Sequence, residues 1–280
     1  MTNSNTSKFI DTSKAQDAGH TIGITSQGTA YSYCHNSKVC DNELGQLGRS
    51  GNPKTKLPII LGANTISEDK ADACDGASNI RVAHAYTGGF ASSGHSALLD
   101  EHGHLWLSGC DRWQQLGLGS SNAGSSGYTW KNGRLWQVEF QKNEHVVELL
   151  KQIDPNLNTS QSTSLSKRWI RDVALGGDHT VILSSNKKDV IVFGKGGEGQ
   201  LGLGSKPWVS ASARSKALSS SSPDIAAVCA FRNCSLTLNE SGDVQKTTGK
   251  CSMDIKGMRK ALEYCQKRGI DSGLITKKSK

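Results

Sequence analysis

The chain has 280 residues with 31 Gly, 5 Pro and a formal net charge of +8. This Gly-rich composition excludes a long coiled coil and is typical of a protein with many short elements. No run approaches the roughly 20 apolar residues that cross a bilayer, and the first residues lack the apolar segment of a secretory signal. We therefore expect an intracellular protein of the nucleus or cytoplasm with no membrane partner, while import into an organelle stays open.

The first repeat unit begins at Gly19-His20-Thr21, continues through an apolar run and ends near Gly48 after the segment Asn-Glu-Leu-Gly-Gln-Leu-Gly. Inside it, Cys34, His35 and Cys40 lie close together in sequence. A structural zinc site needs four ligands, and no second pair lies nearby. We therefore predict no metal here. The eight cysteines form no Cys-x-x-Cys pair, so we expect most of them to be reduced and buried.

Two further units follow the same pattern, and a fourth is degenerate. The second begins at Gly94-His95-Ser96, the third at Asp178-His179-Thr180, and the fourth near Ile225, where Cys234 stands at the His position. A turn glycine lies eight residues after the His or Cys position in three units, and a Gln-Leu-Gly triplet closes the first three. The predicted structural positions of the repeat are Gly19, His20, Gly28, Gly45, Gln46, Gly48, Gly94, His95, Gly103, Gly117, His179, Gly199, Gln200, Gly202 and Gly242.

Each unit is predicted to form a β-hairpin followed by a Gly-rich corner. Short apolar runs such as Val181-Ile182-Leu183, bounded by Gly, Asn and Asp, are typical of small repeated sheets. One hairpin cannot bury its own faces, so the units must pack side by side. The sequence therefore predicts an all-β fold, a propeller or partial propeller of about four recognisable units, with a helical insert and a C-terminal helix.

This repeat resembles that of the regulator of chromosome condensation family. Its most specific marks are Asn42 to Gly48 and Gly197 to Gly202. The resemblance implies β-propeller blades of four strands and, for some members, guanine-nucleotide exchange on a small GTPase. Only four units are visible, whereas the family's propellers have seven blades. The sequence thus leaves open a shortened propeller, diverged blades hidden in the inserts, or one fragment of a longer gene.

The repeat domain is predicted to span residues 1–249, with inserts at 49–78 and 120–168. In the second insert, Asn132-Gly133 predicts a hairpin, and apolar residues at helical spacing predict a helix over 143–153. The simplest interpretation is a decoration packed on the blades, and the alternative is a projection that contacts a partner. The Ser-rich runs 119–127, 159–167 and 210–222 are interpreted as flexible connectors.

Residues 250–280 are predicted to form a basic C-terminal helix and tail, with the helix over Met253 to Arg268. From Val244 onward there are ten Lys or Arg against three Asp or Glu. The helix could cap the exposed edge of the last blade or bind an acidic partner. Any nucleic-acid binding is also expected to belong to this basic tail.

No catalytic constellation emerges, and neither a catalytic residue nor a cofactor is predicted. A His that recurs at one place in each unit serves the unit, so His20, His95 and His179 are interpreted as structural. Gly197, Gly199 and Gly202 match the spacing of a dinucleotide-binding fingerprint, but the strand-turn-helix context is missing. The sequence predicts a non-catalytic protein-protein interaction scaffold. The alternatives are an exchange factor for a small GTPase and a chromatin-associated protein that uses its basic tail.

Overall fold

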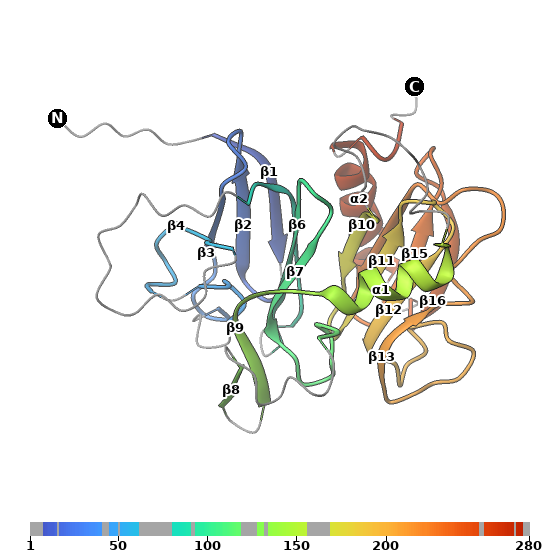
Figure 1. Cartoon of the computed structure of the whole chain (residues 1–280), viewed down its shortest axis with the longest axis horizontal. Coiled ribbons are helices and arrows are strands. Elements are labelled where there is room, and N and C mark those ends of the chain that lie inside the picture. The colour runs from blue at the N-terminus through green and yellow to red at the C-terminus, as the bar shows by residue number, and fades with distance from the viewer. Residues whose placement is uncertain are drawn as a thin grey trace.

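The structure is a computed structural model, which describes residues 8–15, 17–40, 45–49, 51–61, 80–90, 93–118, 128–131, 134–155, 169–251, 255–271 and 273–276. Within these residues the protein consists of four antiparallel sheets and two helices (Figure 1). The prediction of an all-β repeat fold with two helices is therefore confirmed.

Each sheet is one blade, and its strands follow chain order from the innermost strand outward, except that the last two strands of the second blade lie in reverse order. Blade 1 contains β1 (Phe9–Ala15), β2 (His20–Thr25), β3 (Ala30–Cys34) and β4 (Leu57–Pro58). Blade 2 contains β5 (Val82–Gly88), β6 (His95–Asp100), β7 (Leu105–Cys110), β9 (Arg134–Lys142) and β8 (Tyr128–Lys131).

Blade 3 contains β10 (Ile170–Leu175), β11 (His179–Ser184), β12 (Val190–Lys195) and β13 (Val209–Arg214). Blade 4 has three strands, β14 (Ala227–Phe231), β15 (Cys234–Leu238) and β16 (Val244–Gly249). The degenerate fourth unit is thus a blade that lacks an outer strand among the described residues. Figure 1 shows β1 to β9 on the left and β10 to β16 on the right.

The innermost strand of every blade precedes the His or Cys position of its repeat unit. The predicted hairpin of each unit corresponds to the second and third strands, for example β11 and β12, in which His179 pairs with Gly194. All six residues of β11 are buried because this strand lies inside a sheet that is covered on both faces. The apolar residues between blades 3 and 4, including Val181, Leu183 and Val228, form one of the inter-blade cores.

Both regions predicted as inserts contain outer strands of blades. β4 lies within 49–78 and pairs with β3, while β9 lies within 120–168 and pairs with β7. The hairpin predicted at Asn132-Gly133 is confirmed, because β8 pairs with β9 through Lys131 and Arg134. The Ser-rich run 210–222 was wrongly interpreted as a connector, since β13 occupies its first residues. The runs 119–127 and 159–167 lie outside the described residues.

Helix α1 (Glu144–Ile153) forms where the sequence predicts it. The side chain of Asn143 caps its N-terminus by accepting a hydrogen bond from the backbone N–H of Val146. Val146 and Leu150 are buried in a core shared by blades 2 and 3. α1 therefore joins these two blades, and it packs against β13 of the third blade.

Helix α2 (Ile255–Asp271) is also confirmed, but it does not cover the outer side of the last blade. It packs against the innermost strand β14 and is tied to it by a disulfide between Cys229 and Cys265. The Arg268 guanidinium reaches both carboxylate oxygens of Asp172 on β10, at 2.6 and 2.9 Å, and lies 5.4 Å from the Tyr86 ring of β5. α2 thus contacts the inner strands of three blades.

Candidate functional site

The repeat histidines lie at the junctions between consecutive blades. His20 Nε2 of blade 1 is 2.8 Å from the Ser96 hydroxyl of blade 2, and that hydroxyl donates to the carbonyl oxygen of Gln46 in blade 1. The same arrangement recurs between blades 3 and 4, where His179 Nε2 is 2.7 Å from Ser235 and Ser235 donates to Gln200. One hydroxyl therefore binds both the His and the Gln of the preceding blade.

The middle junction keeps half of this pattern. Thr180 of blade 3 donates to the carbonyl oxygen of Gln115 in blade 2 at 2.7 Å. His95 lies beside this contact, with its Nδ1 atom 3.4 Å from the carbonyl oxygen of Ser93. Gln115 occupies the same place as Gln46 and Gln200, although the sequence analysis did not single it out.

Sequence reasoning also missed the hydroxyl residue that follows each repeat His. Thr21, Ser96, Thr180 and Ser235 all stand one residue after the His or Cys position. The signal was present, because every unit has a Ser or Thr there. A role could not be assigned to it from one sequence, since the hydroxyl's partner belongs to a different blade.

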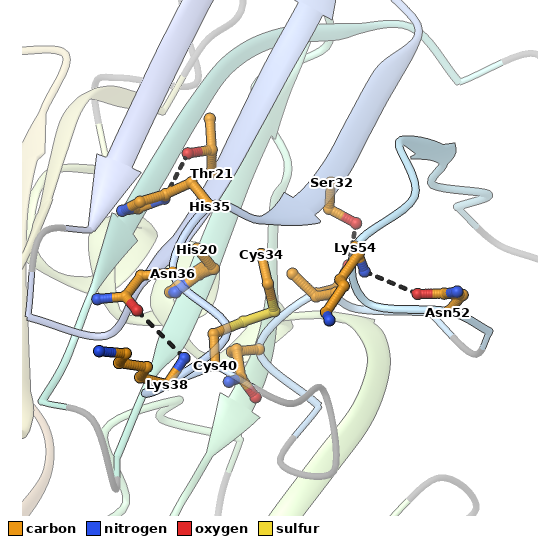
Figure 2. Close-up of a disulfide and its surroundings, with 12 residues drawn as sticks. His20, Thr21, Ser32, Cys34, His35, Asn36, Lys38, Cys40, Asn52 and Lys54 are labelled. Atoms are coloured by element: carbon orange, nitrogen blue, oxygen red, sulfur yellow. Dashed lines mark hydrogen bonds between the residues drawn. A yellow bond between two sulfur atoms is a disulfide. The ribbon is translucent and has the colours of Figure 1, made fainter.

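Both ends of the row of junctions have partners within the chain. In blade 1, which follows no other blade in this structure, the Thr21 hydroxyl is 2.9 Å from His35 Nδ1 (Figure 2). In blade 4, Cys234 replaces the His and forms a disulfide with Cys251. The two terminal blades therefore make contacts that replace those of the internal junctions.

The prediction that most cysteines are reduced is wrong for six of them. Cys34 pairs with Cys40, Cys229 with Cys265, and Cys234 with Cys251. Figure 2 shows the first of these disulfides beside His20 and His35. The error has a physical cause, because pairing depends on which strands and helices become neighbours. No spacing in the sequence reports that α2 lies against β14.

Burial keeps the three repeat histidines neutral. All are fully buried, and desolvation lowers the pKa of His20 to about 3, of His95 to about 4 and of His179 to about 3. Repulsion from His95 lowers the pKa values of His20 and His179 further. A neutral imidazole suits the hydrogen bond with a hydroxyl, so these residues join blades and do not face solvent.

The predicted glycines occupy turns and corners. Nine of them have positive φ angles: Gly19, Gly28, Gly45, Gly48, Gly103, Gly117, Gly199, Gly202 and Gly242. Gly94 has no such angle, and it lies close to Ala18 and Gln46 of the preceding blade. In the third unit Lys187 takes the place of the turn glycine and adopts a φ of 61°.

A cavity lies where the four innermost strands end. It has a volume of about 470 Å³ and is lined by residues from β1, β5, β10, β14 and α2. We call this end of the blades the mouth face, defined by residues 17–19, 88–90, 110–118, 175–178, 195–208 and 231–233. Backbone hydrogen bonds from Gly89 to Gly176 and from Gly177 to Arg232 join three blades around the cavity.

The cavity wall is mainly apolar, and its rim is charged. Phe90, Leu175, Phe231 and Tyr264 lie in the wall. On the rim, the Arg232 guanidinium lies 3.4 Å from the Asp17 carboxylate, which links blade 4 with blade 1. Apolar walls with a few charged groups are typical of sites that bind a side chain or a small molecule.

Nothing in the described residues forms a metal centre. No group of three or more His, Cys, Asp or Glu side chains could hold a metal ion there. No helix in the described part of the chain is both long and apolar enough to cross a membrane.

Comparisons with known proteins support the β-propeller fold that the sequence repeat predicts. No protein-family model matches the chain. A Danio rerio protein named RCC2 homolog is 28% identical over 183 residues, which are 65% of this chain and 30% of that protein. Prp20p of Saccharomyces cerevisiae, described with its binding properties to Gsp1p and histones, has the same fold with a TM-score of 0.53 and 16% identity, over 90% of this chain and 46% of its own.

Human WBSCR16 is similar to the same degree, with a TM-score of 0.53 and 16% identity over 88% of this chain and 48% of its own. The chain thus spans less than half the length of each of these relatives. At these identities the two solved structures establish the fold alone.

Proposed function

We propose that this chain, which is built as propeller blades and whose repeat resembles that of the regulator of chromosome condensation family, is a non-catalytic scaffold that binds a partner protein through its mouth face. The repeat's polar side chains hold blades together and lie away from solvent. The groups that remain free for binding therefore lie elsewhere.

The cavity of the mouth face carries this proposal. It is the place where all four blades and α2 contribute to one concave surface, with aromatic side chains beside charged ones. The Cζ atom of the Arg232 guanidinium lies 5.3 Å from the centroid of the Phe231 ring. The Tyr264 side chain is 45% exposed. Aromatic and Arg side chains dominate the binding energy of protein interfaces.

Site-specific crosslinking tests the proposal. A photoreactive amino acid is placed at Arg232 on the mouth face and, as a control, at Glu101 in the β6–β7 turn at the opposite end of blade 2. We expect one reproducible partner to crosslink from Arg232, and its yield to fall when Phe231→Ala is combined with the probe. Equal crosslinking from Glu101, or none from Arg232, would reject a mouth-face scaffold.

Guanine-nucleotide exchange on a small GTPase is the second candidate, and one observation favours it. Prp20p, whose fold this chain shares, is described by its binding to Gsp1p and histones. Exchange requires a protein surface that displaces the nucleotide and needs no catalytic side chain of its own. Release of a fluorescent GDP from a panel of small GTPases measures it, and unchanged release rates across the panel would exclude this role.

Nucleic-acid binding by the basic tail is less well supported. Lys246 donates to the carbonyl oxygen of Ser219, Lys250 lies 2.5 Å from Glu198, and Arg268 is bonded to Asp172. Three of the ten basic groups are thus engaged within the molecule. Deleting the chain from Val244 onward would also remove β16 and α2, so charge reversal at exposed lysines such as Lys267 is the better test. If the tail binds nucleic acid, binding should depend steeply on salt concentration and should weaken in the charge-reversed variant.

The disulfides bear on the cellular compartment. Disulfides persist in oxidising environments and are rare in the cytosol and nucleus. The three disulfides of this protein do not fit the expected nuclear or cytoplasmic location, so that location stays a prediction. Alkylation of free thiols in cell extracts, followed by mass spectrometry of Cys229 and Cys265, reports whether the bond exists where the protein works.

A further inference from the structure

Two tryptophans from different blades meet on the mouth face. Trp113 belongs to the corner after β7, and Trp208 directly precedes β13. Their ring centroids are 5.7 Å apart in an edge-to-face arrangement with an interplanar angle of 75°. Trp208 is 65% exposed. A large aromatic side chain that stays in water contributes little to folding, so the contact calls for another explanation.

Cations surround this pair. Lys195 Nζ lies 5.2 Å from the Trp113 centroid and 5.8 Å from that of Trp208, and the Arg112 guanidinium lies 4.8 Å from the Trp113 centroid. We call Arg112, Trp113, Lys195 and Trp208 the tryptophan cluster. Its charged and aromatic groups come from two blades that α1 holds together through a shared core.

The surroundings of the cluster carry a net positive charge despite three carboxylates, of which Asp111 directly precedes Arg112 in the chain. Asp178 lies 4.0 Å from Lys195, and Glu198 lies 2.5 Å from Lys250. A hydrogen bond from Lys250 lowers the pKa of Glu198, and the charges of Lys195 and Lys206 lower it further. The four cations Arg112, Lys195, Lys206 and Lys250 thus outnumber the three carboxylates Asp111, Asp178 and Glu198, and the net field attracts anions.

We propose that the tryptophan cluster is a docking site for an extended acidic segment of a partner protein. Trp208 supplies the apolar contact, while Arg112, Lys195 and Lys206 bind carboxylates of the segment. Trp and Arg are the side chains most enriched at interface hot spots. This inference rests on the proposed scaffold function and assigns it a surface and a partner chemistry.

The geometry favours an acidic peptide over a single-stranded nucleic acid. Bases bind by stacking on open aromatic faces. Here Arg112 and Lys195 both lie over the Trp113 ring, and the Trp208 ring rests against Gly197, where an added Cβ atom would be 3.0 Å from it. The cations thus occupy the Trp113 ring, and Gly197 lies along one side of the exposed Trp208 ring, whereas carboxylates need only the cations.

Fluorescence anisotropy with a labelled peptide of alternating glutamate and leucine tests the proposal on the full chain. We expect Trp208→Ala to weaken binding about tenfold or more, as at a hot spot. Lys195→Met should weaken binding and reduce its salt dependence. The control Lys216→Met removes the same charge from an exposed position of blade 3 and should leave binding unchanged. Thermal unfolding of Trp208→Ala should match that of the wild type.

Three results would overturn the inference: unchanged affinity in Trp208→Ala, equal binding of the glutamine version of the peptide, or tighter binding of oligouridine RNA. Tyr264→Ala separates this inference from the scaffold proposal. If Tyr264→Ala abolishes peptide binding and Trp208→Ala does not, the peptide occupies the cavity, and the tryptophan cluster is excluded while the mouth-face scaffold stands. If crosslinking from Arg232 finds no partner, the scaffold proposal itself fails.

Discussion

At the scale of single residues, the β-turns between the second and third strands show what a repeat position requires. Gly28, Gly103 and Gly242 occupy this turn in three blades, with φ angles of 79°, 83° and 79°. In blade 3 the residue is Lys187, with a φ of 61°. A side chain at such an angle is strained by about 1 kcal/mol relative to glycine. This turn position therefore requires a positive φ angle, and in blade 3 Lys187 adopts that angle at the cost of backbone strain.

We expect two substitutions at this turn to change stability in opposite directions. Lys187→Gly should raise the free energy of unfolding by about 0.5–1 kcal/mol, because the Lys187–Glu240 ion pair that it removes is largely exposed and contributes little. Gly103→Ala should lower it by about 1 kcal/mol. Urea denaturation measures both. Lys188→Gly serves as the control and should destabilise, since Lys188 has no positive φ; a loss of stability in Lys187→Gly would contradict the argument.

At the scale of elements, α2 is held on the inner strands by one covalent bond and one buried ion pair. Burial alone would lower the Arg268 pKa, but the Asp172 carboxylate outweighs burial and raises it above its usual range. Asp172 is fully buried and also accepts hydrogen bonds from the backbone N–H groups of Val173 and Val228. The guanidinium further donates to the carbonyl oxygens of Val173 and Val228, so it joins β10 to β14.

Arg268→Met is therefore expected to destabilise the protein by about 3–5 kcal/mol, because it leaves the Asp172 carboxylate buried without its cation. Lys267→Met removes an exposed charge from the same helix and should change stability by less than about 0.5 kcal/mol. Chemical denaturation under non-reducing conditions, which keeps the Cys229–Cys265 bond intact, measures both. Equal stability of the two variants would show that α2 does not depend on this ion pair.

At the scale of the whole molecule, the blade junctions make stability depend on pH. The pKa values of His20, His95 and His179 lie at about 3 to 4 in the folded protein, below the ordinary value of 6.5. Between these values the unfolded chain binds protons that the folded protein does not. Stability is therefore complete above about pH 6.5 and falls as the pH decreases towards 4.

Each pH unit in this range removes about 1.4 kcal/mol per histidine, so the three together should lower the free energy of unfolding by about 6 kcal/mol between pH 7 and pH 5. Urea titrations at the two pH values measure the difference. His179→Gln should reduce this difference by about a third, whereas the exposed His102→Gln should leave it intact. A pH dependence that His179→Gln does not change would show that the buried histidines are not its source.

Much of this architecture could be predicted from the sequence, because hairpins and helices are specified locally. The hairpin of β8 and β9 and the two helices α1 and α2 each depend on neighbouring residues, and all three predictions were confirmed. Contacts between distant residues could not be predicted. The Cys229–Cys265 bond, the pairing of Arg268 with Asp172 and the meeting of Trp113 with Trp208 depend on how blades and helix pack.

The two terminal junctions have a consequence for self-assembly. A molecule that displayed an unoccupied His on its last blade and an unoccupied hydroxyl on its first would carry complementary head and tail surfaces, and identical copies could add end to end into open filaments. Here the Thr21 hydroxyl is engaged by His35, and Cys234 is held by Cys251. Both groups are thus engaged within the chain, and end-to-end addition through them would first have to break the Thr21–His35 contact and the Cys234–Cys251 bond.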